Sequence, residues 1–190
     1  METDLEAVRT NAGVFNVSHF GELEVAGNDA PAVLEHVFGN GVAHLATGTA
    51  KAVDRAVVYR LKKDHFLVMI GKGDVLSTYN RIMEKANAAA DAVAFDASSR
   101  YAVIAVAGPK AQSIVQPLTG VDLGSLQPFD FAHGEFANVR GTVSRTGLMG
   151  ADGFEILVPP QQSDRVWQAL VSNGAVACEP QAVSASALLS

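Results

Sequence analysis

The sequence predicts an α+β protein built from two copies of one strand–helix–sheet unit. Three observations support this prediction. A strand that ends in Val-Ala-Gly and leads into a helix occurs at residues 25–27 and again at 106–108. Each copy is followed by a long stretch typical of antiparallel strands, and each half then closes with an amphipathic helix. The repeated order indicates mainly antiparallel sheets with helices on one face of each.

The elements expected in the first half follow from capping residues, apolar periodicity and turn residues. Thr3 and Glu6 have the spacing of a capping box at the start of a helix. Asp29 is placed to cap the next helix, and Gly39 to end it. The alternation in Glu22–Ala26 is typical of a half-buried strand. In order, we expect a helix at 4–10, strands at 14–17 and 22–26, a helix at 30–38, strands at 52–61 and 65–70, and a helix at 75–90.

The second half repeats this order. Arg140-Gly141 and Asp152-Gly153 are turn signals between apolar runs. In order, we expect a strand at 104–107, a helix at 111–116, strands at 135–139, 142–145 and 154–158, and a helix that begins at Ser163 or Asp164. We interpret residues 1–190 as one domain with pseudo-repeats at about 13–90 and 98–175 and a tail at 176–190. Two similar lobes would leave a cleft where they meet, which is a favoured place for a pocket.

Composition excludes several classes of function. The formal net charge is −6 and no Lys/Arg cluster is present, which disfavours a nucleic-acid partner. No apolar run is long enough to span a bilayer, and the acidic start of the chain is unlike a signal peptide. The single cysteine, Cys178, is interpreted as a small buried hydrophobic residue. These features predict a cytoplasmic protein without a membrane partner.

Three short motifs have a functional and a structural interpretation. Gly71–Asp74 before a helix is closer to a turn with a cap than to a phosphate-binding loop, because the P-loop spacing is missing. His36 and His44 lack the neighbouring cysteines or carboxylates of a metal site, so no metal is expected. Ser18 and His19 are adjacent and would point to opposite faces of a strand, which favours a structural turn over a nucleophile and its base.

Asp54 raises a different question, because it interrupts the apolar run Ala52–Tyr59. A carboxylate inside a buried strand costs free energy unless it is solvated or paired. A surface position beside Arg55 and a functional position are both open interpretations.

Several segments together resemble the glycine-cleavage T-proteins, the tetrahydrofolate-dependent aminomethyltransferases. The similarity covers nearly the whole chain in the family's order. The segments that carry it are AVRTNAGVFNVSH at 7–19, VAGNDA at 25–30, VYRLKKDHFLVM at 58–69, AVAGPKAQSIVQPLTGVDL at 105–123 and SRTGLMGADGFEILVP at 144–159. The resemblance implies the family's duplicated α+β folate-binding fold and a reaction that passes a one-carbon group from an amine to tetrahydrofolate.

The resemblance also implies a set of site residues. Asp54 is the candidate catalytic acid, and His19, Asp54, Arg55 and Tyr59 are candidates for binding tetrahydrofolate. Arg55 stands where the family has its catalytic acid, and a guanidinium cannot accept a proton near neutral pH. As neighbours on one strand, Asp54 and Arg55 are expected to point to opposite faces, with Arg55 toward the cleft.

Other family residues are also replaced. Leu189 stands where the family has the glutamate that holds the pterin, and Leu148 where it has an aromatic residue. The family's C-terminal barrel domain is not expected in this chain. The resemblance with these replacements predicts a folate-binding fold whose aminomethyl transfer is reduced or lost, with weak or no folate binding.

Two alternatives remain beside this interpretation. One is a non-catalytic assembly subunit similar to the small T-protein-like subunit of sarcosine oxidase, and the other is a decayed copy without an independent role. The expected partners are folate or a small amine, together with a protein partner or a second copy at the surface left by the missing barrel. Val183, Leu188 and Leu189 are the candidates for that apolar surface.

Overall fold

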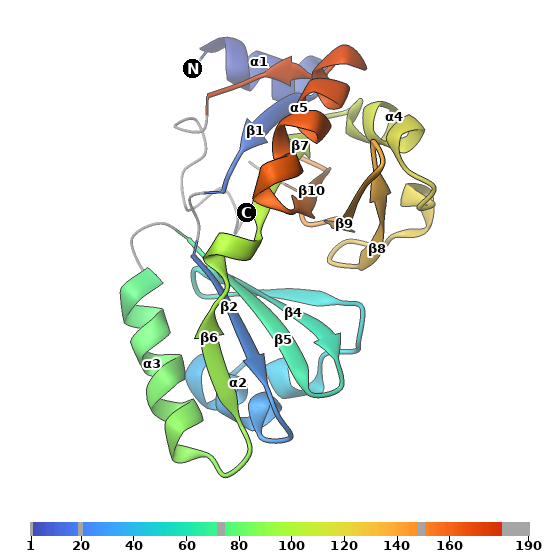
Figure 1. Cartoon of the computed structure of the whole chain (residues 1–190). Coiled ribbons are helices and arrows are strands. Elements are labelled where there is room, and N and C mark those ends of the chain that lie inside the picture. The colour runs from blue at the N-terminus through green and yellow to red at the C-terminus, as the bar shows by residue number, and fades with distance from the viewer. Residues whose placement is uncertain (1, 19–20, 72–74, 148–150, 180–190) are drawn as a thin grey trace. The chain divides into compact units, whose positions relative to one another are not determined.

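A computed structural model of the chain describes residues 2–18, 21–71, 75–147 and 151–179. The chain divides into two compact units (Figure 1). The five-stranded unit comprises His19–Ser99, and the six-stranded unit comprises Met1–Ser18 together with Arg100–Ser190. Each is named for the sheet that its described residues form.

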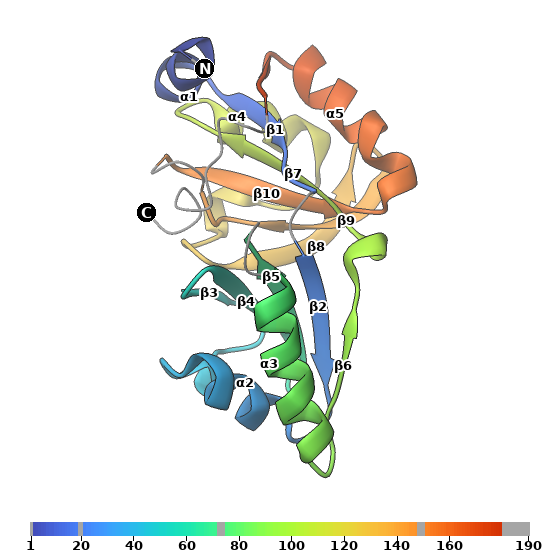
Figure 2. The same cartoon turned by 90° about the vertical axis from the view of Figure 1, so that its left-hand side faces the viewer.

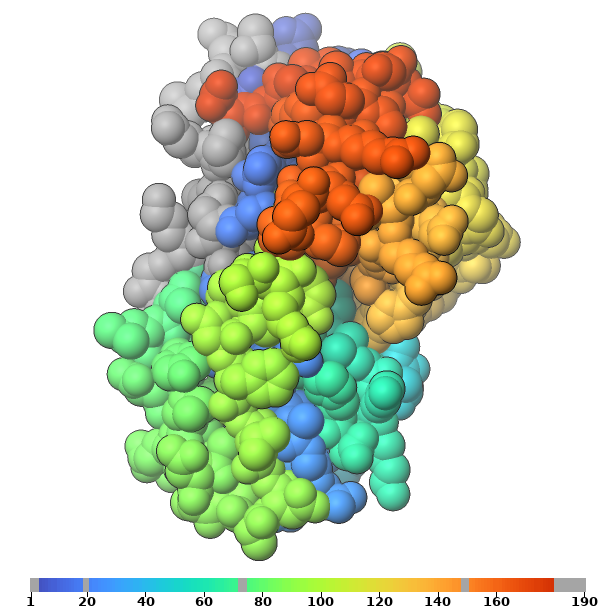
Figure 3. Space-filling view, viewed as in Figure 1, coloured from blue at the N-terminus to red at the C-terminus, as the bar shows by residue number. Residues whose placement is uncertain are grey.

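The five-stranded unit carries two helices and an antiparallel sheet. Its elements are β2 (Gly21–Ala26), α2 (Ala30–Phe38), η1 (Val42–His44), β3 (Ala50–Val53), β4 (Ala56–Lys62), β5 (His65–Ile70), α3 (Val75–Ala88) and β6 (Val93–Asp96). The strand order is β3-β4-β5-β2-β6. Strand β6 is therefore an edge strand, and its segment of the chain lies at the molecular surface, coloured yellow-green in Figure 3.

The six-stranded unit combines the start of the chain with its second half. Its elements are α1 (Glu2–Thr10), β1 (Gly13–Asn16), β7 (Ala102–Ala107), α4 (Ala111–Val115), β8 (Phe131–Phe136), β9 (Val139–Ser144), β10 (Gly153–Val158), α5 (Ser163–Ser172) and β11 (Val176–Ala177), with short 3-10 turns at Gln116–Leu118, Leu123–Ser125 and Pro160–Gln162. A further turn, Ser98–Arg100, joins the two units. The strand order is β11-β1-β7-β10-β9-β8, and all pairs are antiparallel except β1 with β11.

The two sheets repeat one topology. Strands β3, β4, β5, β2 and β6 occupy the same order in one sheet as β8, β9, β10, β7 and β1 do in the other. Strand β1 precedes β2 in sequence but lies in the other sheet, and β6 precedes β7 in the same way. Each copy of the repeat therefore begins with a strand that it contributes to the sheet of the other copy.

The turn after the central strand is the same in both copies. Gly27 has φ +119° and Gly108 has φ +134°, a backbone conformation that residues with a Cβ rarely adopt. A Cβ at Gly27 would lie 2.3 Å from the Asp91 carbonyl oxygen, and one at Gly108 would lie 2.5 Å from that of Asn11. Glycine is required at both positions because the chain that leads into β6, or into β1 in the other copy, passes too close for a Cβ. The backbone hydrogen bonds of the two turns also match. The Asp29 amide donates to the Asp91 carbonyl at 2.9 Å, as the Lys110 amide does to that of Asn11 at 3.0 Å. The Gly27 amide donates to the Asp64 carbonyl at 2.9 Å, as the Gly108 amide does to that of Asp152 at 3.0 Å.

Each unit packs its own hydrophobic core between the helices and one face of the sheet. In the five-stranded unit, Leu23, Val25 and Phe66 contribute to one cluster with Leu34 of α2 and Ile82 of α3. Both helices therefore cover the same face (Figure 2). Fully burying one such side chain stabilises a fold by about 1.5–3 kcal/mol. The corresponding core of the six-stranded unit is formed by Ile104, Val106, Phe154, Ile156, Val166 and Leu170, among others.

The predicted α+β class and its duplication are confirmed, and the differences concern short elements. The run predicted as one strand at 52–61 is two strands, β3 and β4, separated by a turn at Asp54-Arg55. Strand β6 was not predicted, and β8 begins four residues before the predicted strand at 135–139. The prediction of a turn at Arg140-Gly141 is wrong, because both residues lie in β9 and the chain turns at Ala137-Asn138 instead. Cys178 is buried with a free thiol, as its interpretation requires. No helix in the described ranges is long and apolar enough to cross a membrane.

Candidate functional site

The predicted site residues Asp54 and Arg55 form the two-residue turn between β3 and β4. Val53 pairs with Ala56 across this turn, and both turn side chains are exposed. Asp54 has φ +52°, a left-handed conformation that Asp and Asn tolerate better than other residues with a Cβ. The Gly71 amide donates to the Arg55 carbonyl oxygen at 2.9 Å, which joins the turn to the end of β5.

This geometry corrects the expectation that Asp54 and Arg55 occupy opposite faces of one strand. The apolar residues on both sides suggested a continuous strand, but the left-handed turn reverses the chain between them. The carboxylate of Asp54 is therefore solvated without interrupting a strand.

Of the other two predicted folate-binding residues, the structure describes Tyr59 but not His19. Tyr59 lies four residues beyond Arg55 on β4, and its exposed fraction is 1%. It forms an interaction within the structure, so its ring is neither exposed nor without a partner. His19 lies outside the described residues, as do the capping residue Asp74 and the apolar candidates Val183, Leu188 and Leu189.

A hollow of about 410 Å³ lies beside the start of β2, in the same unit as the turn. Strands β2 and β6, helix α3 and the turn after β6 supply its walls. The lining residues are Gly21, Glu22, Leu23, Val75, Leu76, Tyr79, Asp96 and Ser98. Its volume is in the range of small-molecule pockets.

Glu22 is the unusual residue of this hollow. Its exposed fraction is 1%, and within the described part of the chain neither carboxyl oxygen has a hydrogen-bond partner. The pKa of the Glu22 carboxyl is raised to about 8, mainly because the group is buried; the Ser98 hydroxyl lowers the pKa and the negative charge of Asp96 raises it. The carboxyl therefore lies close to two other residues that line the hollow.

Ser98 and Asp96 form a small hydrogen-bonded turn at the end of β6. The Ser98 amide donates to Asp96 Oδ1 at 2.9 Å, and the Glu22 amide donates to Ser98 Oγ at 3.0 Å. Hydrogen bonds from Ser98 lower the pKa of the Asp96 carboxyl, so this group carries a negative charge at neutral pH. The hollow therefore has one ionised and one buried carboxyl group.

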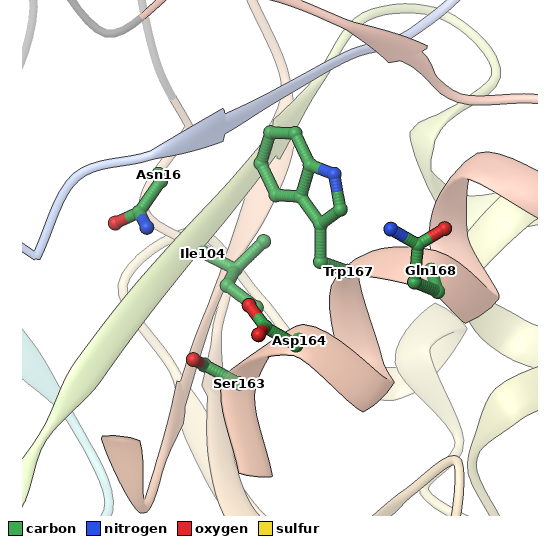
Figure 4. Close-up of a pocket in the computed structure, with 6 residues that line it drawn as sticks. All are labelled: Asn16, Ile104, Ser163, Asp164, Trp167 and Gln168. Atoms are coloured by element: carbon green, nitrogen blue, oxygen red, sulfur yellow. The ribbon is translucent and has the colours of Figure 1, made fainter. Parts of the chain in front are cut away.

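The six-stranded unit contains a corresponding hollow of about 350 Å³ (Figure 4). Asn16 at the end of β1 and Ile104 of β7 line it from the sheet, and α5 lines it from the other side. The residues from α5 are Ser163, Asp164, Trp167 and Gln168. The strand pair Ile104 with Asn16 corresponds to Leu23 with Asp96 in the five-stranded unit.

The turn beside this second hollow has the same hydrogen bonds. The Ser18 amide donates to Asn16 Oδ1 at 3.0 Å, and the Val103 amide donates to Ser18 Oγ at 2.9 Å. Ser18 is thus a structural turn residue, as expected, and Val103 occupies the position that Glu22 has in the first copy. The same backbone arrangement is therefore formed with Asn16 and Val103 in one copy and with Asp96 and Glu22 in the other.

These two turns share a short sequence motif that was not among the predicted features. Phe-Asn-Val-Ser at 15–18 and Phe-Asp-Ala-Ser at 95–98 share the aromatic residue, the Asn or Asp and the serine. An Asn or Asp two residues before a serine is typical of a side chain that accepts from the backbone of a turn. The described residues contain no group of three or more His, Cys, Asp or Glu that could hold a metal ion.

Comparison of the sequence with known proteins gives one family. The family model of the GCVT N-terminal domain matches residues 1–189. An aminomethyltransferase of Exiguobacterium sibiricum is 36% identical over 182 residues, which cover 90% of this chain and 50% of that protein. One of Desulfitobacterium hafniense is 34% identical over 179 residues, covering 89% of this chain and 49% of that protein. The chain thus spans about half the length of these curated relatives.

Two solved structures have a similar fold. The glycine cleavage system aminomethyltransferase T of Bartonella henselae superposes with a TM-score of 0.79 at 19% identity, over 93% of this chain and 50% of that one. A chain of the heterotetrameric sarcosine oxidase of Corynebacterium sp. U-96 superposes with a TM-score of 0.71 at 18% identity, over 85% of this chain and 83% of that one.

Proposed function

Because this chain belongs to the family of the GCVT N-terminal domain, we propose that it is a tetrahydrofolate-binding domain of the one-carbon type whose aminomethyl transfer is reduced or lost. The observation that carries the proposal is the exposed turn of Asp54 and Arg55, at the position that the resemblance assigns to the catalytic acid. In this proposal the protein acts in the cytoplasm, where a buried, reduced Cys178 is stable.

The chemistry of the turn supports weak folate binding better than catalysis. Bound tetrahydrofolate would supply the nitrogen that accepts the one-carbon group. Arg55 is a permanent cation and suits the carboxylates of the folate tail, whereas it cannot take up a proton. Asp54 is left as the acid of the turn that can accept a hydrogen bond from the folate or take up a proton.

Tyr59 and His19 remain candidates for the same ligand. Because only 1% of Tyr59 is exposed, we propose that it supports strand β4 from within the fold and does not offer a free ring face for stacking. His19 follows Ser18, whose hydroxyl accepts from the Val103 amide and so joins the end of β1 to β7. A small amine is the second substrate that the family reaction would require.

Calorimetric titration of the purified chain with tetrahydrofolate tests this proposal. We expect weak binding that Arg55→Gln weakens about tenfold, equal to about 1.4 kcal/mol, because an ionic contact to the folate tail is lost. Asp54→Asn is expected to weaken binding less, and its left-handed backbone tolerates asparagine.

The matched control is Asn138→Asp in the turn between β8 and β9, the counterpart of the Asp54 turn in the other sheet, where Asn138 also has a left-handed backbone, with φ +61°. This variant should bind tetrahydrofolate as the wild type does. Binding that is equally affected by Asn138→Asp, or absent in the wild type, would contradict the assignment of the Asp54–Arg55 turn.

A non-catalytic assembly subunit is the second candidate function. The observation that favours it is the similar fold of a chain of the heterotetrameric sarcosine oxidase, which superposes with a TM-score of 0.71. In this case we expect a homo-oligomer or a stable complex with a partner protein. Light scattering that gives the mass of a monomer, with no partner in its native extract, would count against this candidate.

A further inference from the structure

The buried carboxyl of Glu22 has no role in the turn proposed to bind folate. A carboxyl group without hydrogen-bond partners is costly to bury, and the described structure supplies none for either oxygen. Its counterpart Val103 shows that the fold accepts an apolar side chain at the same position of the same strand pair. The acid is therefore not needed to build the repeat.

The two copies also differ in what lines their hollows. Glu22 is among the lining residues in the five-stranded unit, whereas Val103 is not among those of the other hollow. Asp96 lines the first hollow where Asn16 lines the second. Both acidic replacements occur in one copy and beside one cavity, while the backbone around them is conserved between the copies.

We propose that the hollow beside the start of β2 is a binding site for a compact organic cation, an ammonium group on a short alkyl or aryl chain. Asp96 offers an ionised carboxylate at the mouth, and the buried Glu22 carboxyl would gain the charged partner that it lacks. A cation beside Glu22 would offset part of the cost of burying this carboxyl group, and a ligand that binds only the folded state stabilises that state.

The apolar residues that line the hollow favour an apolar body next to the ammonium group of the ligand. Leu23, Val75 and Tyr79 give the hollow an apolar lining in addition to its two carboxyl groups. Leu76 is 72% exposed at the rim, so a ligand that covers it also buries apolar surface. A volume of about 410 Å³ fits a small molecule. A neutral ligand of the same shape would satisfy the walls but leave both carboxyl groups without a charged partner.

This inference is separate from the proposed function, because it requires neither folate nor transfer activity. The hollow is formed by β2, β6 and α3, whereas the Asp54 turn joins β3 to β4. Failure of folate binding and failure of amine binding are therefore distinguishable in the same protein.

The test is a calorimetric titration of the full chain with benzylammonium chloride, compared with benzyl alcohol as the neutral analogue. We expect benzylammonium to bind at least tenfold more tightly than benzyl alcohol. Glu22→Val, which reproduces Val103, should keep the fold and lose this preference. Asp96→Asn, which reproduces Asn16 and keeps the cap to Ser98, should weaken benzylammonium binding several-fold.

Glu84→Gln is the control, because Glu84 lies on α3 with a side chain that is 74% exposed and does not line the hollow. It should bind benzylammonium as the wild type does. The proposal is overturned if benzylammonium at millimolar concentration does not bind, if it binds no better than benzyl alcohol, or if Glu22→Val retains the wild-type affinity. A folded Glu22→Val protein, checked by circular dichroism, makes the last comparison decisive.

Discussion

At the scale of single residues, Glu22 shows how a duplicated fold separates structural from functional constraints. The same backbone position holds Glu22 in one copy and Val103 in the other, and both are buried. The valine fills its space without a polar group, whereas the glutamate must remain protonated or find a charged partner. Val103 in the second copy therefore shows what the fold alone requires at the position of Glu22.

Glu22 should make the stability of the chain depend on pH. Its pKa is about 8 in the folded protein against an ordinary value of 4.5, so the folded state holds the proton more tightly. Its contribution to stability is fully present below pH 4.5 and is lost as the pH rises through 8. Across that range the wild type should lose at most about 5 kcal/mol of unfolding free energy relative to Glu22→Val.

Urea unfolding of both proteins at pH 5 and pH 9 measures this difference. The control Glu84→Gln should follow the wild type at both pH values, because the Glu84 side chain is largely exposed. Equal pH dependence in the wild type and in Glu22→Val would mean that the Glu22 carboxyl is solvated in the folded protein, contrary to its burial.

The burial of Glu22 could not have been predicted from its sequence neighbours. Glu22–Ala26 alternates polar and apolar residues, which correctly predicted a strand with Leu23 and Val25 in the core. The same alternation indicated that Glu22 and Glu24 face water, yet their exposed fractions are 1% and 4%. Alternation identifies the two faces of a strand but not what covers the second face.

At the scale of elements, the two copies anchor their central hairpins with equivalent arginines. Arg60 at the end of β4 lies over the Phe66 ring at 5.2 Å, and Arg145 after β9 lies over the Phe154 ring at 5.9 Å. Each Nη1 donates to the carbonyl of a preceding loop, at 2.7 Å to Leu45 for Arg60 and at 2.9 Å to Leu126 for Arg145. Arg145 also makes a bidentate pair with Asp152, at 2.9 and 2.6 Å.

Replacing either anchor by lysine should destabilise the fold although the charge is kept. Lysine lacks the planar fork that stacks on a ring and reaches several oxygens at once. We expect Arg60→Lys and Arg145→Lys each to lower the free energy of unfolding by about 1–2 kcal/mol, measured by urea denaturation. Arg140→Lys is the control, because the Arg140 side chain is 93% exposed and should change little. Two anchor variants no less stable than Arg140→Lys would show that the arginines do not hold the hairpins.

Most elements could be predicted because their signals are local. Val-Ala-Gly before a helix and the periodicity of residues 75–88 are visible in a short window of sequence. The turn at Asp54-Arg55 was missed because Asp-Arg lacks the glycine that usually marks a two-residue hairpin, and the aspartate itself takes the left-handed conformation. Strand β6 was missed because four residues, of which all but Ala94 are exposed, give little periodic signal.

At the scale of the whole molecule, the repeat order was predictable but its connectivity was not. The strands β1 and β6 open the two copies, and each pairs in the sheet that the other copy supplies. This exchange depends on pairing between residues far apart in sequence, which no local pattern encodes. Asp54 and Arg55 could be identified as candidates because they are adjacent in the sequence. The cavity beside Glu22 could not be predicted, because its lining residues come from β2, α3 and β6, which are far apart in the sequence.

The family is common to this chain and its relatives, whereas the proposed loss of transfer belongs to this chain. It has Arg55 at the position that the resemblance assigns to the acid. The retained fold is therefore separate from the changed site, and the two are tested by different measurements.

The most direct test of that separation is the transfer of a one-carbon unit from an aminomethyl donor to tetrahydrofolate by the purified chain. We expect no product above the uncatalysed background, because Arg55 cannot take up a proton at the position assigned to the acid. Asp54→Asn should then be indistinguishable from the wild type. Turnover by the wild-type chain, at a rate that Asp54→Asn abolishes, would contradict the account.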